Sequence, residues 1–197
     1  MVQWMQHALR HGGILAVKQS LTKLWIWNAF NELMAGTSFN RITVEMIIEK
    51  SGVAKSTFYR HFRDKYDVLN YNSTALADRL IGQQKCADWK EFLLCMSRSI
   101  ARDIRYYGQA FRTFGQNAHS DFLFSYTFKF VEKCYLTHYN QEQLTGAARN
   151  AVVHYCHGCV GLLKDWLNDP EEQTPEQIAE SFYQCMPHFL RDTWIYG

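Results

Sequence analysis

The prolines of this chain all lie near its C-terminal end. They occupy positions 170, 175 and 187 of a 197-residue sequence, so the first 169 residues lack the strongest helix breaker. Hydrophobic residues make up 47% of the chain, which is enough to bury a core. We therefore predict an all-α protein of about nine helices.

The first predicted helix runs from Ser20 to Ala35. Hydrophobic residues recur there at helical spacing, and Gly36 is placed to end the helix. Residues 1 to 17 match no such pattern. We expect them to be an extension or a translation artefact.

Two short helices are predicted next. Thr43 can cap the first of them, which Ser51-Gly52-Val53 ends after about two turns. The second runs from Ala54 to Phe62. A further helix should begin at Asp64, with Asp67 as its capping-box partner. Two short helices joined by a glycine-containing turn and braced by a third are typical of a helix-turn-helix.

The second short helix carries polar side chains on the face that its apolar residues leave free. These are Lys55, Ser56, Thr57, Tyr59, Arg60 and His61. A helix in the major groove of DNA needs hydrogen-bonding groups that reach base edges and cations that reach phosphates. A polar outer face is also ordinary on any surface helix, so residue types alone leave both interpretations open. The formal charge of the whole chain is only +2, but the stretch from Arg41 to Lys65 holds six basic and three acidic side chains.

The run from Ile42 to Leu69 resembles the DNA-binding signature of the TetR family. The matching features are the Thr43-Val44 opening, the Gly52-Val53 turn, a Thr-Phe-Tyr-x-His-Phe core and the lysine after it. Ala54 departs from the pattern, because the family usually has a capping residue there, and we expect a cap weaker by about 1 kcal/mol. The resemblance implies a three-helix DNA-binding domain over residues 18–64 and a helical ligand-binding and dimerisation domain over residues 65–197.

The family pattern also implies individual roles. The residues expected to contact phosphates are Thr43, Tyr59, His61 and Lys65. Those expected to enter the groove are Lys55, Ser56 and Thr57, since the N-terminal residues of the recognition helix point deepest. Arg60 could contact either a base or a phosphate, and Phe58 and Phe62 should be core residues.

The second domain resembles the family more loosely. Its helices are predicted near residues 65–83, 88–105, 106–117, 120–138, 147–167 and 175–195. The stretch from His154 to Leu167, followed by Asp169-Pro170 and by Thr174 to Ala179, looks like the last two helices of the branch that includes regulators associated with dihydroxyacetone kinase operons. In the family such helices enclose a pocket, and an aromatic lining would suit an apolar or aromatic effector. The candidate pocket residues are Phe92, Met96, Tyr107, Phe111, Phe114, Phe122 and Tyr126. Aromatic residues at helical spacing also make ordinary core, and that alternative stays open.

One DNA-binding module contacts one half-site, so useful affinity requires a two-fold dimer with recognition helices about 34 Å apart. The last two helices are expected to form the interface, where small residues let backbones approach closely. The candidates are Ala151, Gly158, Gly161, Phe182 and Phe189. The alternative is that the small residues pack only within the subunit.

Cys156 and Cys159 form a C-x-x-C with His154 and His157 nearby, a pattern that raises zinc or redox chemistry. Inside an apolar helix the two cysteines are more simply small core residues. We expect no metal, no cofactor and no structural disulfide. No nucleophile, phosphate-binding or dinucleotide-binding motif occurs, so we expect no catalytic residues and no enzymatic activity.

The sequence therefore predicts a cytoplasmic TetR-type repressor that binds a near-palindromic operator as a homodimer and responds to an unknown small-molecule effector. No apolar run approaches the ~18 residues needed to span a bilayer, so no membrane partner is expected. The alternative is a coactivator of the same fold that acts mainly through a protein partner. Failure to bind any DNA at low salt would favour that alternative.

Overall fold

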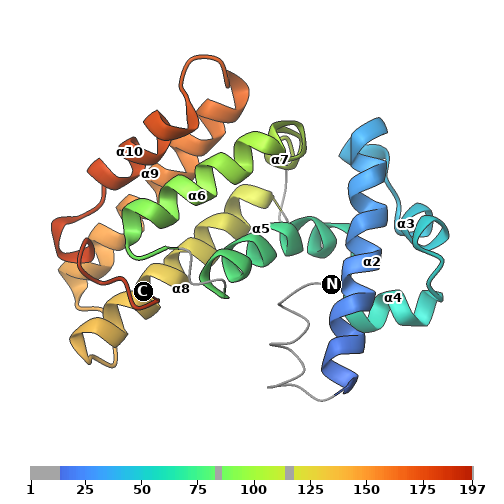
Figure 1. The fold of residues 1–197 in the computed structure, drawn as a ribbon, viewed down its shortest axis with the longest axis horizontal. Coiled ribbons are helices and arrows are strands. Elements are labelled where there is room, and N and C mark those ends of the chain that lie inside the picture. The colour runs from blue at the N-terminus through green and yellow to red at the C-terminus, as the bar shows by residue number, and fades with distance from the viewer. Residues whose placement is uncertain (1–13, 83–85, 114–117, 197) are drawn as a thin grey trace. The chain divides into compact units, whose positions relative to one another are not determined.

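The computed structural model describes residues 14–82, 86–113 and 118–196 (Figure 1). Throughout these ranges the regular secondary structure is helical, with nine α-helices, α2 to α10, two 3-10 helices and no β-strand. The prediction of an all-α chain with about nine helices is confirmed. Within the same ranges no helix is long and apolar enough to cross a membrane.

The chain divides into two compact units, the first ending at Asn72 and the second beginning at Ser73. The division falls inside α5 (Lys65–Gly82), so the first turns of this helix belong with the N-terminal unit. The domain boundary expected between residues 64 and 65 stays a prediction.

The first unit contains α2 (Ile14–Gly36), the 3-10 helix η1 (Phe39–Arg41), α3 (Val44–Ser51) and α4 (Lys55–His61). The helix α2 packs against α3 and α4. It begins at Ile14, earlier than the predicted start at Ser20 and inside the segment expected to be an extension. The reason is that residues 14–19 contain neither proline nor glycine to stop the helix.

The core of this unit is made by apolar side chains from all of its helices. Its most deeply buried members are Ile26, Phe30, Ile42, Ile47, Phe58, Val68 and Leu69. Phe58 is 0% exposed and Phe62 is 3% exposed, which confirms both as core residues. Their rings lie 6.1 Å apart between centroids, and they hold the inner face of α4 against the unit.

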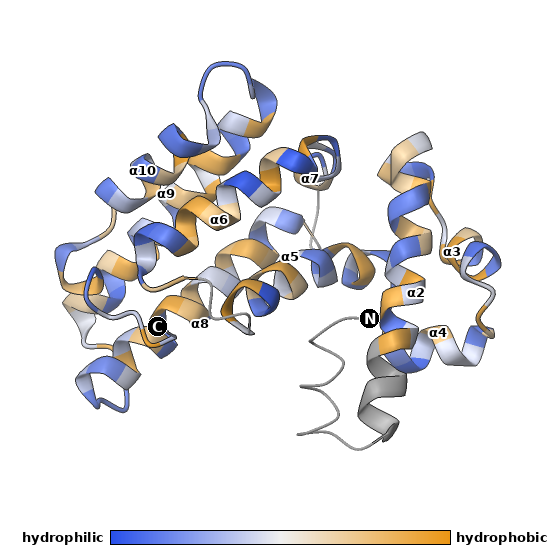
Figure 2. Ribbon diagram, in the orientation of Figure 1, coloured by the Kyte–Doolittle hydropathy of each residue, from blue (hydrophilic) through white to orange (hydrophobic). Residues whose placement is uncertain are grey.

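The second unit is built from the rest of α5 and five further helices with a 3-10 turn near the end. These are α6 (Trp89–Arg102), α7 (Ile104–Phe111), α8 (His119–Tyr139), α9 (Gly146–Asn168), α10 (Pro175–Gln184) and η2 (His188–Leu190). The helix α6 packs mainly along α10, and α8 packs along α9. Figure 2 shows hydrophobic and hydrophilic residues alternating along α6, as expected of a helix with one buried face.

The last predicted helix, residues 175–195, ends earlier than expected. It begins with a complete capping box between Thr174 and Gln177 but ends at Gln184, and Pro187 then precedes η2. Proline cannot continue a helix, because it lacks the backbone N–H and its ring clashes with the preceding turn. The chain beyond η2 returns to α6, where the Trp89 indole N–H donates to Thr193 Oγ1 at 3.3 Å.

Candidate functional site

The helix α3 is bounded by two local signals that the sequence carries, one at its start and one at the turn that leads to α4. Thr43 caps α3, with its Oγ1 accepting a hydrogen bond from the Met46 N–H at 3.2 Å, as predicted. Gly52 ends α3 in the left-handed region at φ 67°, which a side chain would make strained. The pair of short helices joined by this turn has the helix-turn-helix arrangement.

The outer face of α4 presents the polar side chains that the sequence singled out. Lys55, Ser56, Tyr59 and Arg60 are exposed, whereas Thr57 and His61 are half-buried. Tyr59 is 49% exposed, although its ring also meets Phe58 edge-on. The outer face of α4 therefore offers hydroxyl groups and cations to a partner, while the aromatic residues on its inner face stay fixed.

The start of α4 lacks a side-chain cap. Ala54 occupies the cap position in an extended conformation, and no side chain there accepts a hydrogen bond. The expected weak cap is thus confirmed. Backbone N–H groups near a helix start without such an acceptor are available to an external one.

The Lys65 ammonium group is held by backbone carbonyls. Its Nζ donates to Phe39 O at 2.9 Å, to Ile42 O at 2.8 Å and to Asn40 O at 3.3 Å. It also lies 4.5 Å from the centre of the Phe39 ring, and burial lowers the pKa of Lys65. Three acceptors match the three N–H bonds of an ammonium group. This geometry favours a structural role, fixing η1 and the entry to α3, over the expected phosphate contact.

The surroundings of His61 disfavour its charged form. Burial, followed by the charges of Arg60 and Lys23, lowers the pKa of His61 below its ordinary value. Among the residues that the structure describes, its buried Nε2 has no hydrogen-bond partner.

The charged side chains around α4 are exposed and only weakly paired. Lys55 Nζ lies 3.9 Å from Glu45 Oε1, and both side chains are largely exposed, so this pair contributes little. Arg41, Arg60 and Arg63 are exposed as well. Cations in this state can exchange water for a phosphate at small cost.

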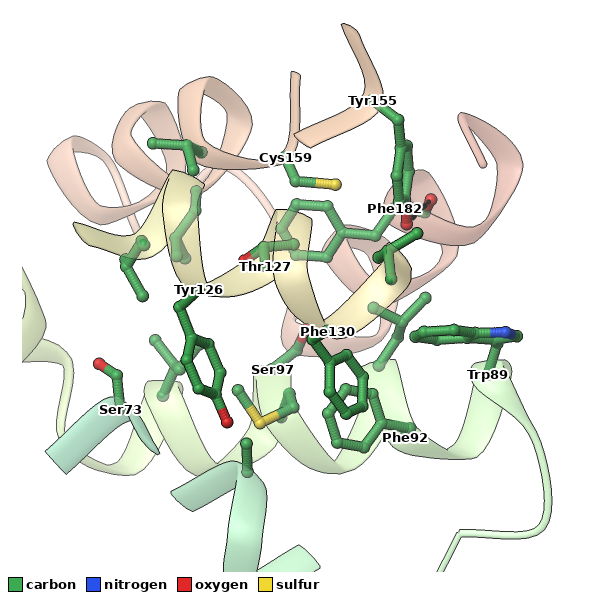
Figure 3. A pocket seen from close by; sticks show the side chains of 18 of the residues that line it. Ser73, Trp89, Phe92, Ser97, Tyr126, Thr127, Phe130, Tyr155, Cys159 and Phe182 are labelled. Carbon is green, nitrogen blue, oxygen red and sulfur yellow. Dashed lines mark hydrogen bonds between the residues drawn. The ribbon is translucent and has the colours of Figure 1, made fainter. Parts of the chain in front are cut away.

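The second unit contains a partly open cavity of about 130 Å³ (Figure 3). Residues of α5, α6, α7, α8, α9 and α10 line it, and most of them are apolar or aromatic. Phe92 of α6 and Phe130 of α8 stack at one side, with ring centroids 5.4 Å apart. Such a space, apolar with a few hydroxyl groups, is typical of a small-molecule site.

Four of the seven candidate pocket residues line this cavity: Phe92, Met96, Tyr107 and Tyr126. Two others, Phe111 and Phe122, do not line it. Their ring centroids lie 5.5 and 6.1 Å from that of His119. The seventh, Phe114, lies outside the residues that the structure describes.

Several lining residues were missed by the sequence analysis. The most informative are Trp89, Ser97, Phe130, Tyr155 and Cys159. A signal existed for Ser97, because it falls four residues after Leu93 on the apolar face of α6. A single hydroxyl on an otherwise apolar helical face is a reason to suspect a polar contact.

The candidate interface residues lie in different environments. Gly158 and Gly161 of α9 are exposed, and an added Cβ at either would meet nothing within 4 Å. Ala151 is half-buried. Phe182, in contrast, is 7% exposed and lines the cavity, and half-buried Phe189 lies in η2 against Tyr135. The glycines therefore lie exposed on the surface of the subunit, whereas Phe182 is buried in its interior.

The six cysteines of the chain are free thiols. Burial raises the pKa of Cys156 and of Cys159 to about 12, so both stay protonated at neutral pH. Over the described ranges no group of three or more His, Cys, Asp and Glu residues could hold a metal ion.

Comparison with solved structures shows the same fold in known regulators. The dihydroxyacetone kinase operon activator DhaS superposes with a TM-score of 0.58 at 15% identity, covering 86% of this chain and 94% of DhaS. A TetR transcriptional regulator from Streptococcus agalactiae gives 0.56 at 19% identity, covering 87% and 96% of the two chains. NalD, the secondary repressor of the MexAB-OprM multidrug efflux pump in Pseudomonas aeruginosa, gives 0.52 at 19% identity, with coverages of 89% and 99%. At these identities the likeness concerns the fold alone.

Family profiles match the sequence of both units. Residues 26–71 match "Bacterial regulatory proteins, tetR family", and residues 87–188 match "Transcriptional regulator C-terminal region". No curated protein shows significant sequence similarity to the chain. The second profile alone spans more than half of the sequence, and together with the helix-turn-helix it shows that this chain belongs to the TetR family of transcriptional regulators.

Proposed function

We propose that this chain is a cytoplasmic, ligand-responsive regulator that binds a near-palindromic operator as a homodimer. The observation that carries the proposal is the exposed polar face of α4, backed by the buried rings of Phe58 and Phe62. Buried rings lie beneath any amphipathic surface helix, so the support for the proposal comes from the polar face together with the helix-turn-helix arrangement and the family match. In a recognition helix the rings have a further role, because the angle at which the helix enters the groove decides which bases it reaches.

The contacts follow from position along α4. Lys55, Ser56 and Thr57 at its N-terminus contact base edges, where hydroxyl and ammonium groups can discriminate between bases. Tyr59 and Arg60 contact the backbone, flanked by Thr43 at the start of α3 and by His61. Backbone contacts fix the register, and base contacts supply the specificity. Lys65 contributes indirectly, because its ammonium group fixes the backbone carbonyls of Phe39, Asn40 and Ile42.

Dimerisation places two such helices about 34 Å apart on one face of the duplex. The open glycines of α9 support an interface there, because a partner helix can approach closely where no Cβ projects. They weaken the alternative in which these small residues pack only within the subunit. A two-fold dimer reads two half-sites of opposite orientation, and its operator is therefore a near-palindrome.

We propose repression as the effect on transcription and the cavity of the second unit as the effector site. A ligand shifts DNA affinity only through different affinities for the DNA-competent and DNA-incompetent states. Both signs of regulation occur among proteins of this fold, since DhaS is described as an activator and NalD as a repressor. A reporter driven by the operator decides the sign: deletion of the regulator raises expression if it represses.

The proposal is tested by selecting bound sequences from a random double-stranded DNA pool at moderate salt. The test variant is Lys55→Ala/Thr57→Ala/Tyr59→Ala, which shortens three side chains of α4 and keeps the buried residues Phe58 and Phe62. A matched control, Lys129→Ala/Thr137→Ala/Tyr139→Ala, removes the same residue types from exposed positions on α8.

Wild type and the α8 variant should enrich the same near-palindrome, and the α4 variant should enrich none. If the wild-type protein enriches nothing above a salt-sensitive background, the proposal fails. A coactivator that works through a protein partner then becomes the leading function.

A further inference from the structure

One polar group of the cavity stands out because nothing satisfies it. Ser97 on α6 is 1% exposed and lines the cavity, and its Oγ has no hydrogen-bond partner among the residues that the structure describes. Serine inside a helix commonly donates to the carbonyl four residues earlier, as Ser99 does to Cys95 O at 2.8 Å on the same helix. A buried hydroxyl without a partner is unfavourable, so a group that binds there and pairs with it gains affinity.

The remaining polar groups of the cavity are neutral. No Asp, Glu, Lys, Arg or His is among its described lining residues. Burial raises the pKa of Tyr126 and of Cys159 to about 12, which keeps the phenol and the thiol protonated. The Tyr155 hydroxyl already donates to Phe182 O at 3.1 Å. A charged ligand would lose its hydration here and find no counter-ion.

The size of the cavity bounds the ligand further. Apolar cavities of about 150 Å³ bind benzene, and this one measures about 130 Å³. Trp89, Phe92 and Phe130 form an aromatic side, where ring planes favour offset or edge-on contact with another ring (Figure 3). The space suits one ring with a small substituent.

We propose that the cavity binds an uncharged, single-ring aromatic molecule whose one hydrogen-bonding substituent pairs with the Ser97 hydroxyl. This names the chemical class of the effector and rests on the proposed function only in calling that molecule an effector. The apolar ring fills the space between the helices, and Ser97 selects the molecule that carries a hydroxyl, amino or carbonyl group over the bare hydrocarbon.

Three probes of similar ring size separate the contributions: phenol, toluene and benzoate. Binding of each to the full chain is measured by isothermal titration calorimetry at pH 7, in the absence of DNA. Phenol should bind about fivefold more tightly than toluene, because one neutral hydrogen bond is gained. Benzoate, ionised at this pH, should not bind. Equal affinity for benzoate and phenol would overturn the proposal, as would the absence of binding by all three probes up to their solubility.

Variants assign the binding to Ser97 and to the cavity. Ser97→Ala should lower the affinity for phenol below that for toluene, because the phenol hydroxyl is then buried without a partner, and should leave toluene unchanged. Ser99→Ala should change neither. Val160→Phe, which fills part of the cavity, should abolish binding of both. Phenol affinity that survives Ser97→Ala, or binding that survives Val160→Phe in a protein of native helicity, contradicts the assignment.

These titrations contain no DNA, so their failure is distinguishable from failure of the proposed function. A protein that selects an operator but ignores phenol and toluene is a regulator with a different ligand class. A protein that binds phenol through Ser97 but selects no DNA has the site without the regulatory function proposed for it.

Discussion

Replacing Lys65 with methionine separates the structural role of its ammonium group from a direct contact with DNA. Methionine keeps much of the apolar stem but removes the donors to Phe39 O, Asn40 O and Ile42 O. Two of these hydrogen bonds are part-buried, and each is worth about 1 kcal/mol. The cation–π contact with Phe39 adds about 0.5 kcal/mol, and the exposed bond to Asn40 adds little. We expect the free energy of unfolding of the DNA-binding unit to fall by about 2–3 kcal/mol.

Urea denaturation followed by circular dichroism measures this loss, and amide hydrogen exchange should locate it in η1 and α3. A direct phosphate contact predicts another pattern: unchanged stability, with a salt dependence of DNA binding that is shallower by about one counterion. Arg60→Met, at an exposed position on α4 that the proposed function places against the DNA backbone, should show that second pattern and serves as the control. If Lys65→Met retains wild-type stability and loses salt dependence as Arg60→Met does, the structural role is wrong.

Three further perturbations have expected outcomes. Ala54→Ser supplies the missing cap of α4 and should raise the free energy of unfolding, measured by urea denaturation, by about 1 kcal/mol. An unchanged free energy of unfolding would mean that another acceptor already caps the helix. Gly161→Glu should convert a dimer to a folded monomer in analytical ultracentrifugation while Gly161→Ala keeps a folded chain, and a glutamate variant that stays dimeric would remove this face from the interface. Burial lowers the pKa of His119 to about 4, so the stability it contributes is present above pH 6.5, the ordinary value, and is lost as the pH falls towards 4. Between pH 7 and pH 5 wild type should lose about 2 kcal/mol more than His119→Gln, and equal losses in urea denaturation would contradict the assignment.

The DNA-binding unit was predictable because its signals are local in sequence. Thr43 caps the helix that follows it, Gly52 ends that helix, and Phe58 and Phe62 lie one turn apart. Each of these features acts within a few residues of itself. The partners of Lys65 are different, since they are carbonyls more than twenty residues earlier in the chain. No periodicity or motif reports such a contact.

The cavity was only partly predictable, because periodicity gives the apolar face of a helix but not the neighbour that the face meets. Phe92 and Met96 share the face of α6 that lines the cavity. Phe122 looked equivalent in sequence, but its ring packs on His119, one turn before the cavity-lining Tyr126 on α8. Phe182 was expected at an interface and lies inside, because the inward face of α10 packs on α6.

The most direct test of DNA recognition by α4 compares the affinity for the selected operator with that for a scrambled duplex of the same composition. Fluorescence anisotropy at two salt concentrations gives both affinities and separates specific from non-specific binding. We predict that wild type prefers the operator by at least about a thousandfold and that Lys55→Ala/Thr57→Ala/Tyr59→Ala loses this preference. Equal affinity of wild type for the two duplexes, with the same salt dependence, would contradict sequence-specific recognition.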